Sequence, residues 1–253
     1  MIALEHLTLA YGSRVLVRKA SARLPQGSLT ALIGRNGTGK STLLRVVAGL
    51  DAPAAGAVRL CGRPLSELTP RERAATVSFV TTDKVRIANL TSEELVALGR
   101  APYTDWMGRM GETDRAVVSR ALDRVGMAGF ARKTMDRMSD GECQRVMIAR
   151  ALAQDTPVIL LDEPTAFLDL PNRYSLASLL RRLAREEGKC ILFSTHDLDV
   201  ALTLCDGIAL IDTPSLYHLP AAEMAASGHI ERLFAGEGIA FDPATQTIRL
   251  LKR

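Results

Sequence analysis

The sequence predicts an α/β protein built on a mainly parallel β-sheet, with a helical segment inserted into it. Short apolar runs typical of buried strands alternate with stretches of helical periodicity along most of the chain. From about residue 84 to residue 155 the pattern is instead mostly helical. We therefore expect one sheet-based core at about 1–83 and 156–212, a helical subdomain at about 84–155, and a short C-terminal tail at 213–253.

The first part of the core is expected to consist mostly of strands. LTALI at 29–33 is a compact apolar run that leads into a glycine-rich turn. STLLRVVAGL at 41–50 then has helical spacing, which gives the order strand, loop, helix. AGAVRLCG at 55–62 and ATVSFVTT at 75–82 again have the pattern of strands.

The remaining elements follow the same reading. Three helices are expected in the inserted segment, at 92–100, 113–127 and 142–154. Buried strands of the kind found in parallel sheets are expected at 157–164, 189–197 and 206–212. An amphipathic helix is expected at 174–188, between the first two of these strands. The tail is expected to contain strands at 215–219 and 245–251 and helices at 221–228 and 229–236.

Composition limits the classes of function. The chain has 253 residues, of which 47% are hydrophobic and 24% charged, and a net charge of +4. Its arginines are spread through helical patterns, so a nucleic-acid face is not favoured. We expect no signal peptide at the N-terminus, and no run approaches the roughly 18 apolar residues of a membrane span. Action at a membrane would need another chain. The four cysteines form no CxxC pair and are expected to be reduced thiols.

The segment GRNGTGKS at 34–41 matches the phosphate-loop pattern G-x-x-x-x-G-K-[ST] between a strand and a helix. Its backbone N–H groups would surround phosphate oxygens, Lys40 would reach the β- and γ-phosphates, and Ser41 would offer a hydroxyl to Mg²⁺. Thr42 would face the α-phosphate. A chance glycine-rich turn is the weaker alternative. The residues expected at the nucleotide are Gly34, Asn36, Gly37, Gly39, Lys40, Ser41 and Thr42.

Two acids and a histidine follow the later buried strands. Asp162, at the end of one strand, would hold Mg²⁺, and Glu163 would polarise an attacking water. His196 ends the strand expected beside it, which would place this histidine near the γ-phosphate. The plainer interpretations are two solvent-facing acids that cap a strand and a structural histidine.

Together with further motifs, these residues identify a resemblance. The chain resembles the ATP-binding subunit of an ATP-binding-cassette (ABC) transporter over about residues 1–212. GRNGTGKS resembles the Walker A loop, VILLDEP the Walker B strand, MSDGE at 138–142 the signature, AFLD at 166–169 the D-loop, and His196 the switch histidine. Tyr11 stands where the family's adenine-stacking aromatic does. The resemblance implies an ABC ATPase fold, with an antiparallel N-terminal β-subdomain and an inserted helical subdomain.

The resemblance also implies a head-to-tail homodimer that sandwiches each ATP between two copies. The signature residues Ser139, Gly141 and Glu142 of one copy would lie at the γ-phosphate bound by the other, and Asp169 would help couple the two sites. Ser139 with Glu142 also has the pattern of a helix capping box, and both roles are compatible. The carboxylate of Asp140 must then point away from the phosphate or be paired.

One departure from the family pattern concerns Mg²⁺. ABC subunits usually carry a glutamine at the end of the strand before the helical subdomain, and here Thr82 stands at that position. A threonine hydroxyl can still contact the metal or its water, but it is shorter. We expect hydrolysis to survive, with looser or rerouted coupling between the nucleotide and the helical subdomain.

The segment 90–114 resembles the corresponding part of importers for iron siderophores, haem and cobalamin. Its aromatics Tyr103 and Trp106 could contribute to a groove that receives a membrane subunit, or could merely pack within the insert. The partners implied are a homodimer mate, integral-membrane permease subunits and, indirectly, a substrate-binding protein, with no nucleic acid. The place implied is the cytoplasmic face of the inner membrane.

Alternatives remain at this point. An ABC-type ATPase could act on DNA or ribosomes, although such proteins usually carry two cassettes or a long coiled-coil insert. A nucleotide-gated binding protein without hydrolysis would lack Glu163 or His196, and this chain has both. A phosphate-loop kinase would give no reason for MSDGE and AFLD at these spacings.

Overall fold

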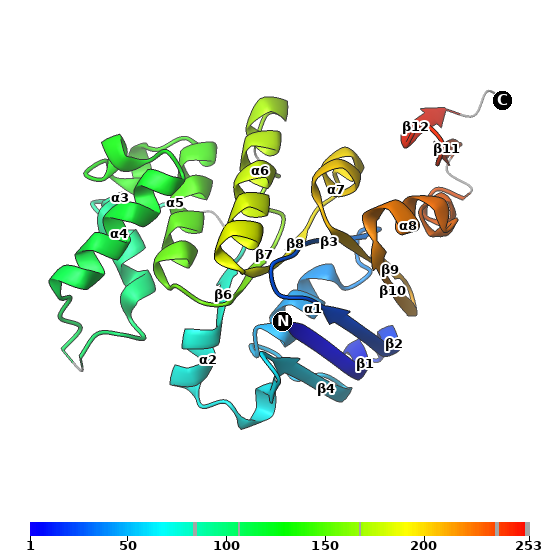
Figure 1. Ribbon diagram of the computed structural model, residues 1–253, viewed down its shortest axis with the longest axis horizontal. Helices are drawn as coiled ribbons and strands as arrows, with labels where there is room; N and C mark the ends of the chain where they lie inside the picture. The colour runs from blue at the N-terminus through cyan, green and yellow to red at the C-terminus, as the bar shows by residue number, and fades with distance from the viewer. Residues whose placement is uncertain (83–84, 106, 167, 236–237, 251–253) are drawn as a thin grey trace.

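A six-stranded sheet forms the centre of the molecule (Figure 1), in the order β10-β9-β3-β8-β7-β6. The computed structural model describes residues 1–82, 85–105, 107–166, 168–235 and 238–250. Five of the strands run parallel to one another, and β10 is antiparallel to β9. The strands are β3 Leu29–Gly34, β6 Val77–Val80, β7 Val158–Leu161, β8 Cys190–Ser194, β9 Gly207–Asp212 and β10 Ser215–Pro220. The mainly parallel sheet is therefore confirmed.

A second, antiparallel sheet is built from the N-terminal part of the chain, in the order β2-β1-β4-β5. Its long strands β1 and β2 form a hairpin in which buried and exposed side chains do not alternate strictly, and the pairing between the two strands contains register shifts. The strands are β1 Ile2–Tyr11, β2 Arg14–Leu24, β4 Ala55–Leu60 and β5 Arg63–Pro64.

The inserted helices pack against one another beyond the β6 edge of the central sheet (Figure 1). They are α3 Ser92–Ala97, α4 Glu112–Arg124 and α5 Asp140–Ala153. The Nε atom of Arg100 donates to Asp114 at 2.9 Å, and its Nη1 donates to the carbonyl of Ala153 at 2.7 Å. This buried arginine therefore ties the segment after α3 to both α4 and α5.

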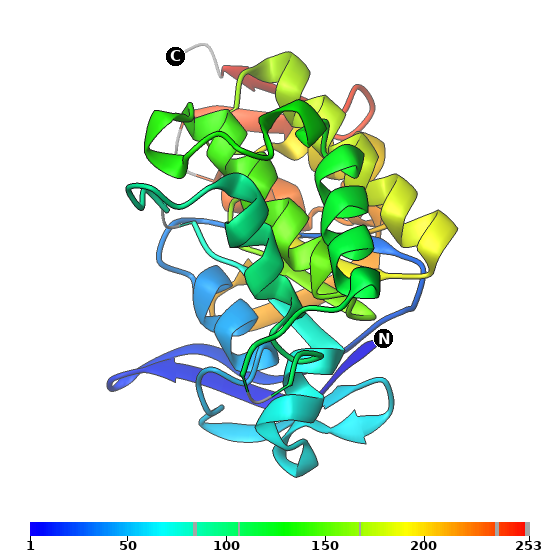
Figure 2. The ribbon, with the colours of Figure 1, turned by 90° about the vertical axis from the view of Figure 1, so that its left-hand side faces the viewer.

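The other helices flank the two sheets, and the tail adds a small hairpin. Figure 2 looks onto the inserted helices, with the N-terminal sheet at one end of the molecule and the C-terminal hairpin at the other. The helices are α1 Lys40–Val47, α2 Pro70–Thr76, α6 Leu170–Glu187, α7 Leu198–Leu204, α8 Ala221–Ala226 and α9 His229–Leu233. The hairpin strands are β11 Ile239–Asp242 and β12 Thr247–Leu250.

The buried apolar side chains form two clusters on opposite faces of the central sheet. One joins Ala31 and Ile33 of β3 to the inserted helices, α6 and the tail. The other joins Leu32 of the same strand to α1 and the N-terminal sheet. Alternate residues of one strand therefore contribute to both cores, as expected for a strand buried on both faces. In the described ranges, no helix has the length and apolar character needed to cross a bilayer.

Some expected elements differ from the structure. Residues 75 and 76, expected at the start of a strand, instead end α2, because Thr69 and Glu72 form a capping box with Pro70 at the first helical position. These residues are a signal for the start of a helix that is visible in the sequence, and the sequence analysis missed it. The short helix α7 and the strand β11 were also missed. The four elements expected in the tail are present within its described residues.

Candidate functional site

The phosphate loop connects β3 to α1 and takes a backbone path that few residues allow. Gly39 has a φ of 103°, a left-handed conformation that side chains disfavour. A Cβ atom at Gly34 would lie 2.7 Å from the carbonyl oxygen of Ile211, so the approach of β9 also requires glycine. The predicted loop therefore forms, and its glycines are explained by the local geometry.

Lys40 lies buried at the start of α1, with its side chain folded over the loop. Its Nζ atom donates to the carbonyl oxygens of Gly34 at 2.9 Å and Arg35 at 3.2 Å. Burial lowers the pKa of Lys40 below its usual value, while the carboxylates of Glu163 and Asp162 act in the opposite direction. The ammonium group is thus held inside the loop, between the loop carbonyls and the two acids.

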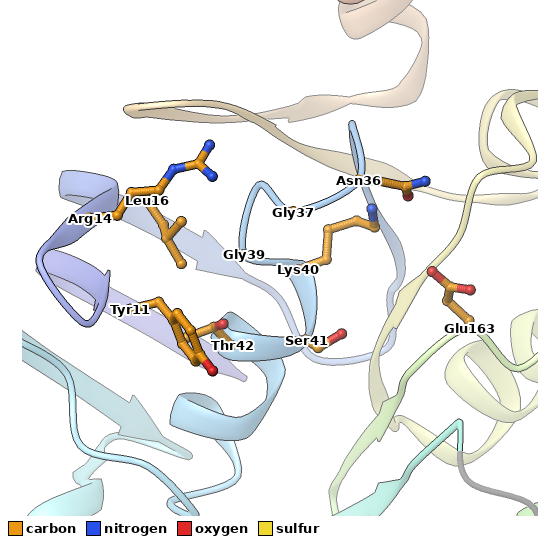
Figure 3. Close-up of a pocket in the computed structure, with 10 residues that line it drawn as sticks. All are labelled: Tyr11, Arg14, Leu16, Asn36, Gly37, Gly39, Lys40, Ser41, Thr42 and Glu163. Carbon is orange, nitrogen blue, oxygen red and sulfur yellow. The ribbon is translucent and has the colours of Figure 1, made fainter.

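A cavity of about 380 Å³ opens between this loop and the β1–β2 hairpin (Figure 3). Tyr11 forms one wall and is 78% exposed. Glu163 lies on the opposite side of the loop in the same view. Every wall residue comes from β1, β2, the loop, α1 or the end of β7. The lining residues are Tyr11, Arg14, Leu16, Asn36, Gly37, Gly39, Lys40, Ser41, Thr42 and Glu163.

The two acids follow β7 and are held by a serine of the neighbouring strand. The Ser194 hydroxyl donates to Asp162 Oδ1 at 2.6 Å and accepts from the backbone N–H of Glu163 at 2.8 Å. Leu161 pairs with Phe193 in the parallel register of β7 and β8, so the next residues, Asp162 and Ser194, also face each other. Glu163 has a φ of 48°, which is strained for a residue with a side chain.

His196 reaches the carboxylate of Glu163. Its Nε2 atom lies 2.8 Å from Glu163 Oε1, so the structure brings together the two residues that the sequence analysis placed on neighbouring strands. A second cavity of about 300 Å³ lies beside this pair. Its wall includes Arg173, which donates to the carbonyl of Leu168 at 2.8 Å and pairs with Asp197 at 3.6 Å.

Thr82 contacts the same region through the backbone. Its hydroxyl donates to the carbonyl oxygen of Asp162 at 3.1 Å. The side chain is thus placed next to the acid pair, as the motif position predicted. Its hydroxyl oxygen retains lone pairs with which to accept from a water.

The signature residues lie elsewhere. Ser139 caps α5, accepting from the Glu142 N–H at 3.3 Å, and Glu142 accepts from the Ser139 N–H at 2.8 Å, so the predicted capping box is confirmed. Asp140 is paired with Arg86 at 2.5 Å, which resolves the expected problem of its charge. Gly141 faces Leu168, since a Cβ there would lie 3.2 Å from that side chain.

The structure does not bring the signature to the phosphate loop of the same chain. No residue of α5 is among the described residues that line the nucleotide cavity, and α5 belongs to the helical insert (Figure 1). Asp169 is likewise absent from that lining; it caps α6 and accepts from the Asn172 N–H at 3.1 Å. Trp106, expected on the docking surface, lies outside the described residues.

Sequence reasoning missed several residues in or beside these cavities, among them Ser194, Arg14, Leu16 and Arg173. Ser194 could have been found from the expected parallel pairing, since it ends the strand beside Asp162. Arg14 and Leu16 follow Tyr11 across a tight turn, which two strands in sequence with a Gly-Ser turn would have indicated. No sequence signal points to Arg173, because only the fold brings this residue of α6 close to Asp197.

Comparison with known proteins adds independent findings. The family model described as ABC transporter matches residues 17–166 of the chain. The iron(3+)-hydroxamate import ATP-binding protein of Bacillus subtilis is 39% identical over 200 residues, which cover 79% of this chain and 74% of that relative.

Two solved structures are similar in fold. One is a protein described as a metal-chelate type ABC transporter in an inward-facing conformation, with a TM-score of 0.82 and 26% identity, covering 92% of this chain and 88% of that one. The other is a dimeric ATP-binding cassette bound to ADP and Pi, with a TM-score of 0.77 and 28% identity, covering 87% of this chain and 99% of that one.

Proposed function

The chain belongs to the ABC transporter family, and from that premise we propose that it is the ATP-hydrolysing subunit of an importer for iron chelates or cobalamin. ATP-binding subunits of this family are ATPases that drive transport through separate membrane subunits. The observation that carries the proposal is the meeting of Glu163 and His196 beside the phosphate loop, at the ends of neighbouring parallel strands. We also propose that the chain divides into a sheet-based core, a helical subdomain and a C-terminal tail.

In the proposed complex, ATP fills the cavity between Tyr11 and the loop. The exposed Tyr11 ring would stack on adenine, and the N–H groups of Gly37, Gly39 and Lys40 would donate to the phosphates. The Lys40 ammonium would exchange its two carbonyl contacts for phosphate oxygens. Asn36, Ser41 and Thr42 line the same space and complete the polar wall.

The residues near the acid pair fit a Mg²⁺ ion. Ser41 and Thr82 offer hydroxyl oxygens and Asp162 a carboxylate, which are hard oxygen ligands of the kind that Mg²⁺ binds together with phosphates. The Asp162 Oδ2 atom has no hydrogen-bond partner among the described residues, whereas Oδ1 accepts from Ser194. When bound, the ion would neutralise charge on the β- and γ-phosphates.

Hydrolysis would proceed by attack of water on the γ-phosphorus, with cleavage of its bond to the β–γ bridging oxygen, giving ADP and phosphate. Glu163 would orient this water and accept its proton. His196 fixes the Glu163 carboxylate at 2.8 Å and would lie next to the γ-phosphate. Ser194 holds the strained backbone of Glu163 from which this carboxylate extends.

The second side of each site would come from another copy of the chain. The α5 N-terminus carries Ser139 and the N–H of Gly141 on a surface away from its own cavity, and ATP-bridged pairing would supply them with a γ-phosphate. Glu142 would hold Ser139 in place through the capping box, and Asp169 would face the partner's site. The proposal is supported by one similar solved cassette, bound to ADP and Pi, which is dimeric.

The cargo class rests on relatives rather than on the site. One relative is named for import of iron(3+)-hydroxamate, and one similar structure for a metal chelate. We propose a permease partner at the cytoplasmic face of the inner membrane, an indirect substrate-binding protein and no nucleic-acid partner. Exposed apolar side chains of the insert that suit a permease contact are Ile87, Leu98 and Met107. The Tyr103 hydroxyl instead makes a contact within the insert, since it donates to the Gln154 carbonyl at 2.9 Å.

Substitution of Glu163 by glutamine tests the proposed mechanism. Glu163→Gln keeps the size of the side chain but removes the proton acceptor, so turnover should fall about 100-fold or more. ATP should then persist between two copies. Light scattering after gel filtration with saturating Mg-ATP should show a dimer for Glu163→Gln and a monomer without nucleotide.

Glu223→Gln, an exposed change on α8, is the matched control and should behave like the unaltered chain. A Glu163→Gln protein that binds ATP but stays monomeric would contradict the shared site.

A further inference from the structure

An arginine outside the phosphate loop lines the nucleotide cavity. Arg14 is the first residue of β2 and faces Tyr11 directly across the β1–β2 hairpin. It forms part of the same wall as Tyr11 and Leu16. The hairpin that would receive the base therefore also presents a permanent positive charge to the cavity.

Among the residues that the structure describes, Arg14 has no partner of its own. No hydrogen bond or ion pair joins its side chain to any residue that the structure describes, and its side chain is exposed. Two other arginines of the same sheet are paired: Arg59 lies 3.1 Å from Glu5, and Arg63 lies 2.9 Å from Glu72. No described residue compensates the Arg14 charge, which is therefore available to a bound anion.

The direction of the side chain separates it from the expected position of the base. Figure 3 shows the Arg14 guanidinium running away from the Tyr11 ring, on the side of the cavity where Gly37 lies. A base stacked on Tyr11 would leave its phosphates near the loop. The guanidinium is therefore placed on the phosphate side of the nucleotide rather than over its base.

The charges around the cavity favour the same occupant. Lys40 is the other cation of the described wall, and it is buried and held by two loop carbonyls. Glu163 is the acid of that wall, and it is engaged by His196. A triphosphate brings several negative charges, and a guanidinium offers a planar fork of donors that matches phosphate oxygens.

We propose that Arg14 binds a phosphate group of the bound nucleotide and thereby strengthens the site for nucleotides over nucleosides. This inference rests on the proposed ATP site. Arg14 would act on binding and not on the chemical step, because it lies across the cavity from Glu163. An exposed contact of this kind should contribute about 5- to 20-fold to affinity at low salt.

The test is a set of dissociation constants for the full chain, measured by calorimetry with adenosine, AMP, ADP and a non-hydrolysable ATP analogue. Arg14→Ala should weaken the ATP analogue and ADP by about 5- to 20-fold and leave adenosine unchanged. The loss should shrink as salt is added, because the contact is screened. Arg14→Lys should restore part of the affinity.

Arg18→Ala is the matched control, since Arg18 is exposed on the same strand but is not part of the cavity wall. It removes the same charge and should leave all four constants unchanged. Equal weakening of adenosine and the ATP analogue by Arg14→Ala, or no weakening of either, would overturn the role of Arg14. An unaltered chain that binds none of the four would instead refute the ATP site itself.

Discussion

At the scale of single residues, Ser194 is the side chain that organises the acid pair. It is fully buried, and its one hydroxyl serves the carboxylate of Asp162 and the N–H of Glu163 at once. A left-handed backbone costs a residue other than glycine roughly 1–2 kcal/mol. The hydroxyl thus offsets part of the strain at Glu163 and holds its backbone in place, while His196 contacts its carboxylate.

We expect Ser194→Ala to lower the turnover number of the ATPase about 10-fold, because the loss of a hydrogen bond of about 1–1.5 kcal/mol frees the Glu163 backbone. The dissociation constant for ATP should change by less than about 2-fold, since Ser194 does not line the cavity. Steady-state kinetics and calorimetry with a non-hydrolysable analogue measure the two quantities.

Ser78→Ala provides the comparison, since Ser78 is equally buried on β6 and bonds to Thr156 at 3.1 Å, away from the acids. It should lower stability without a matching loss of turnover. If the ratio of lost turnover to lost melting temperature is the same for Ser194→Ala and Ser78→Ala, Ser194 contributes only to folding.

At the scale of elements, three helices begin with the same device. A Ser or Thr and a Glu three positions later exchange hydrogen bonds at the starts of α2, α3 and α5. In each case these hydrogen bonds lower the pKa of the glutamate, and for Glu72 the pKa falls to about 2. For Glu142, the hydrogen bond from the Lys133 side chain is the largest cause of the lowered pKa. The capping boxes therefore make helix starts sensitive to acid.

Glu72 allows the direction of this pH dependence of stability to be tested. Its pKa is about 2 in the folded chain and 4.5 in its usual state, so its stabilisation is complete above about pH 4.5 and is lost as the pH falls toward 2. Glu72→Gln should lower the melting temperature at pH 7, and the difference from the unaltered chain should shrink between pH 5 and pH 2.5. Thermal unfolding followed by circular dichroism measures it.

The control for this series is Glu67→Gln, two residues before the N-cap residue Thr69, at the exposed end of a 3₁₀ turn. Its side chain makes no hydrogen bond or ion pair to the described residues, so the melting temperature should stay within about 1 °C of the unaltered chain at every pH. A constant gap between Glu72→Gln and the unaltered chain across the pH range would show that Glu72 does not titrate with folding.

At the scale of the whole molecule, the helical insert is hydrogen-bonded to the sheet that carries the phosphate loop. Arg150 of α5 donates to the Phe79 carbonyl of β6 at 3.0 Å. Gln154 donates to the carbonyls of Ala74 at 2.7 Å and Val77 at 3.1 Å. These contacts join the signature helix to the strand that leads to Thr82. A membrane subunit docked on the insert would be connected to the site through them.

We expect a polytopic permease to co-purify with the tagged chain from its native membrane. The ATPase rate of the eluate should rise when an iron chelate or cobalamin is added with its binding protein, because transport and hydrolysis are linked. Leu98→Asp should reduce co-purification, since Leu98 is 58% exposed on the insert. Leu50→Asp, with Leu50 55% exposed at the end of α1, is the control. Recovery of ribosomes or nucleic acid alone would contradict the transport role.

Much of this site could be predicted from the sequence, and the reason is physical. Motifs such as GRNGTGKS encode their own backbone path, since Gly39 permits the left-handed turn and Lys40 folds back on the same loop. Local signals were also sufficient for the Ser139–Glu142 capping box. They were overlooked for α2, where the strand pattern of 75–82 competed with Thr69 and Pro70. The roles assigned to Tyr11, Thr82 and Asp169 stay predictions.

By itself, the sequence determined the fold class, the family, the phosphate loop and the identity of the two acids and the histidine. These follow from local patterns, in which residues close along the chain dictate one another's conformation. Only the tertiary structure decided that Ser194 holds both acids, that Arg86 neutralises Asp140, and that Arg14 lies in the nucleotide cavity with no pairing partner in the described part of the chain. Each depends on segments distant in sequence or on the absence of a neighbour, and hydrophobic burial fixes such relations only when the whole chain packs.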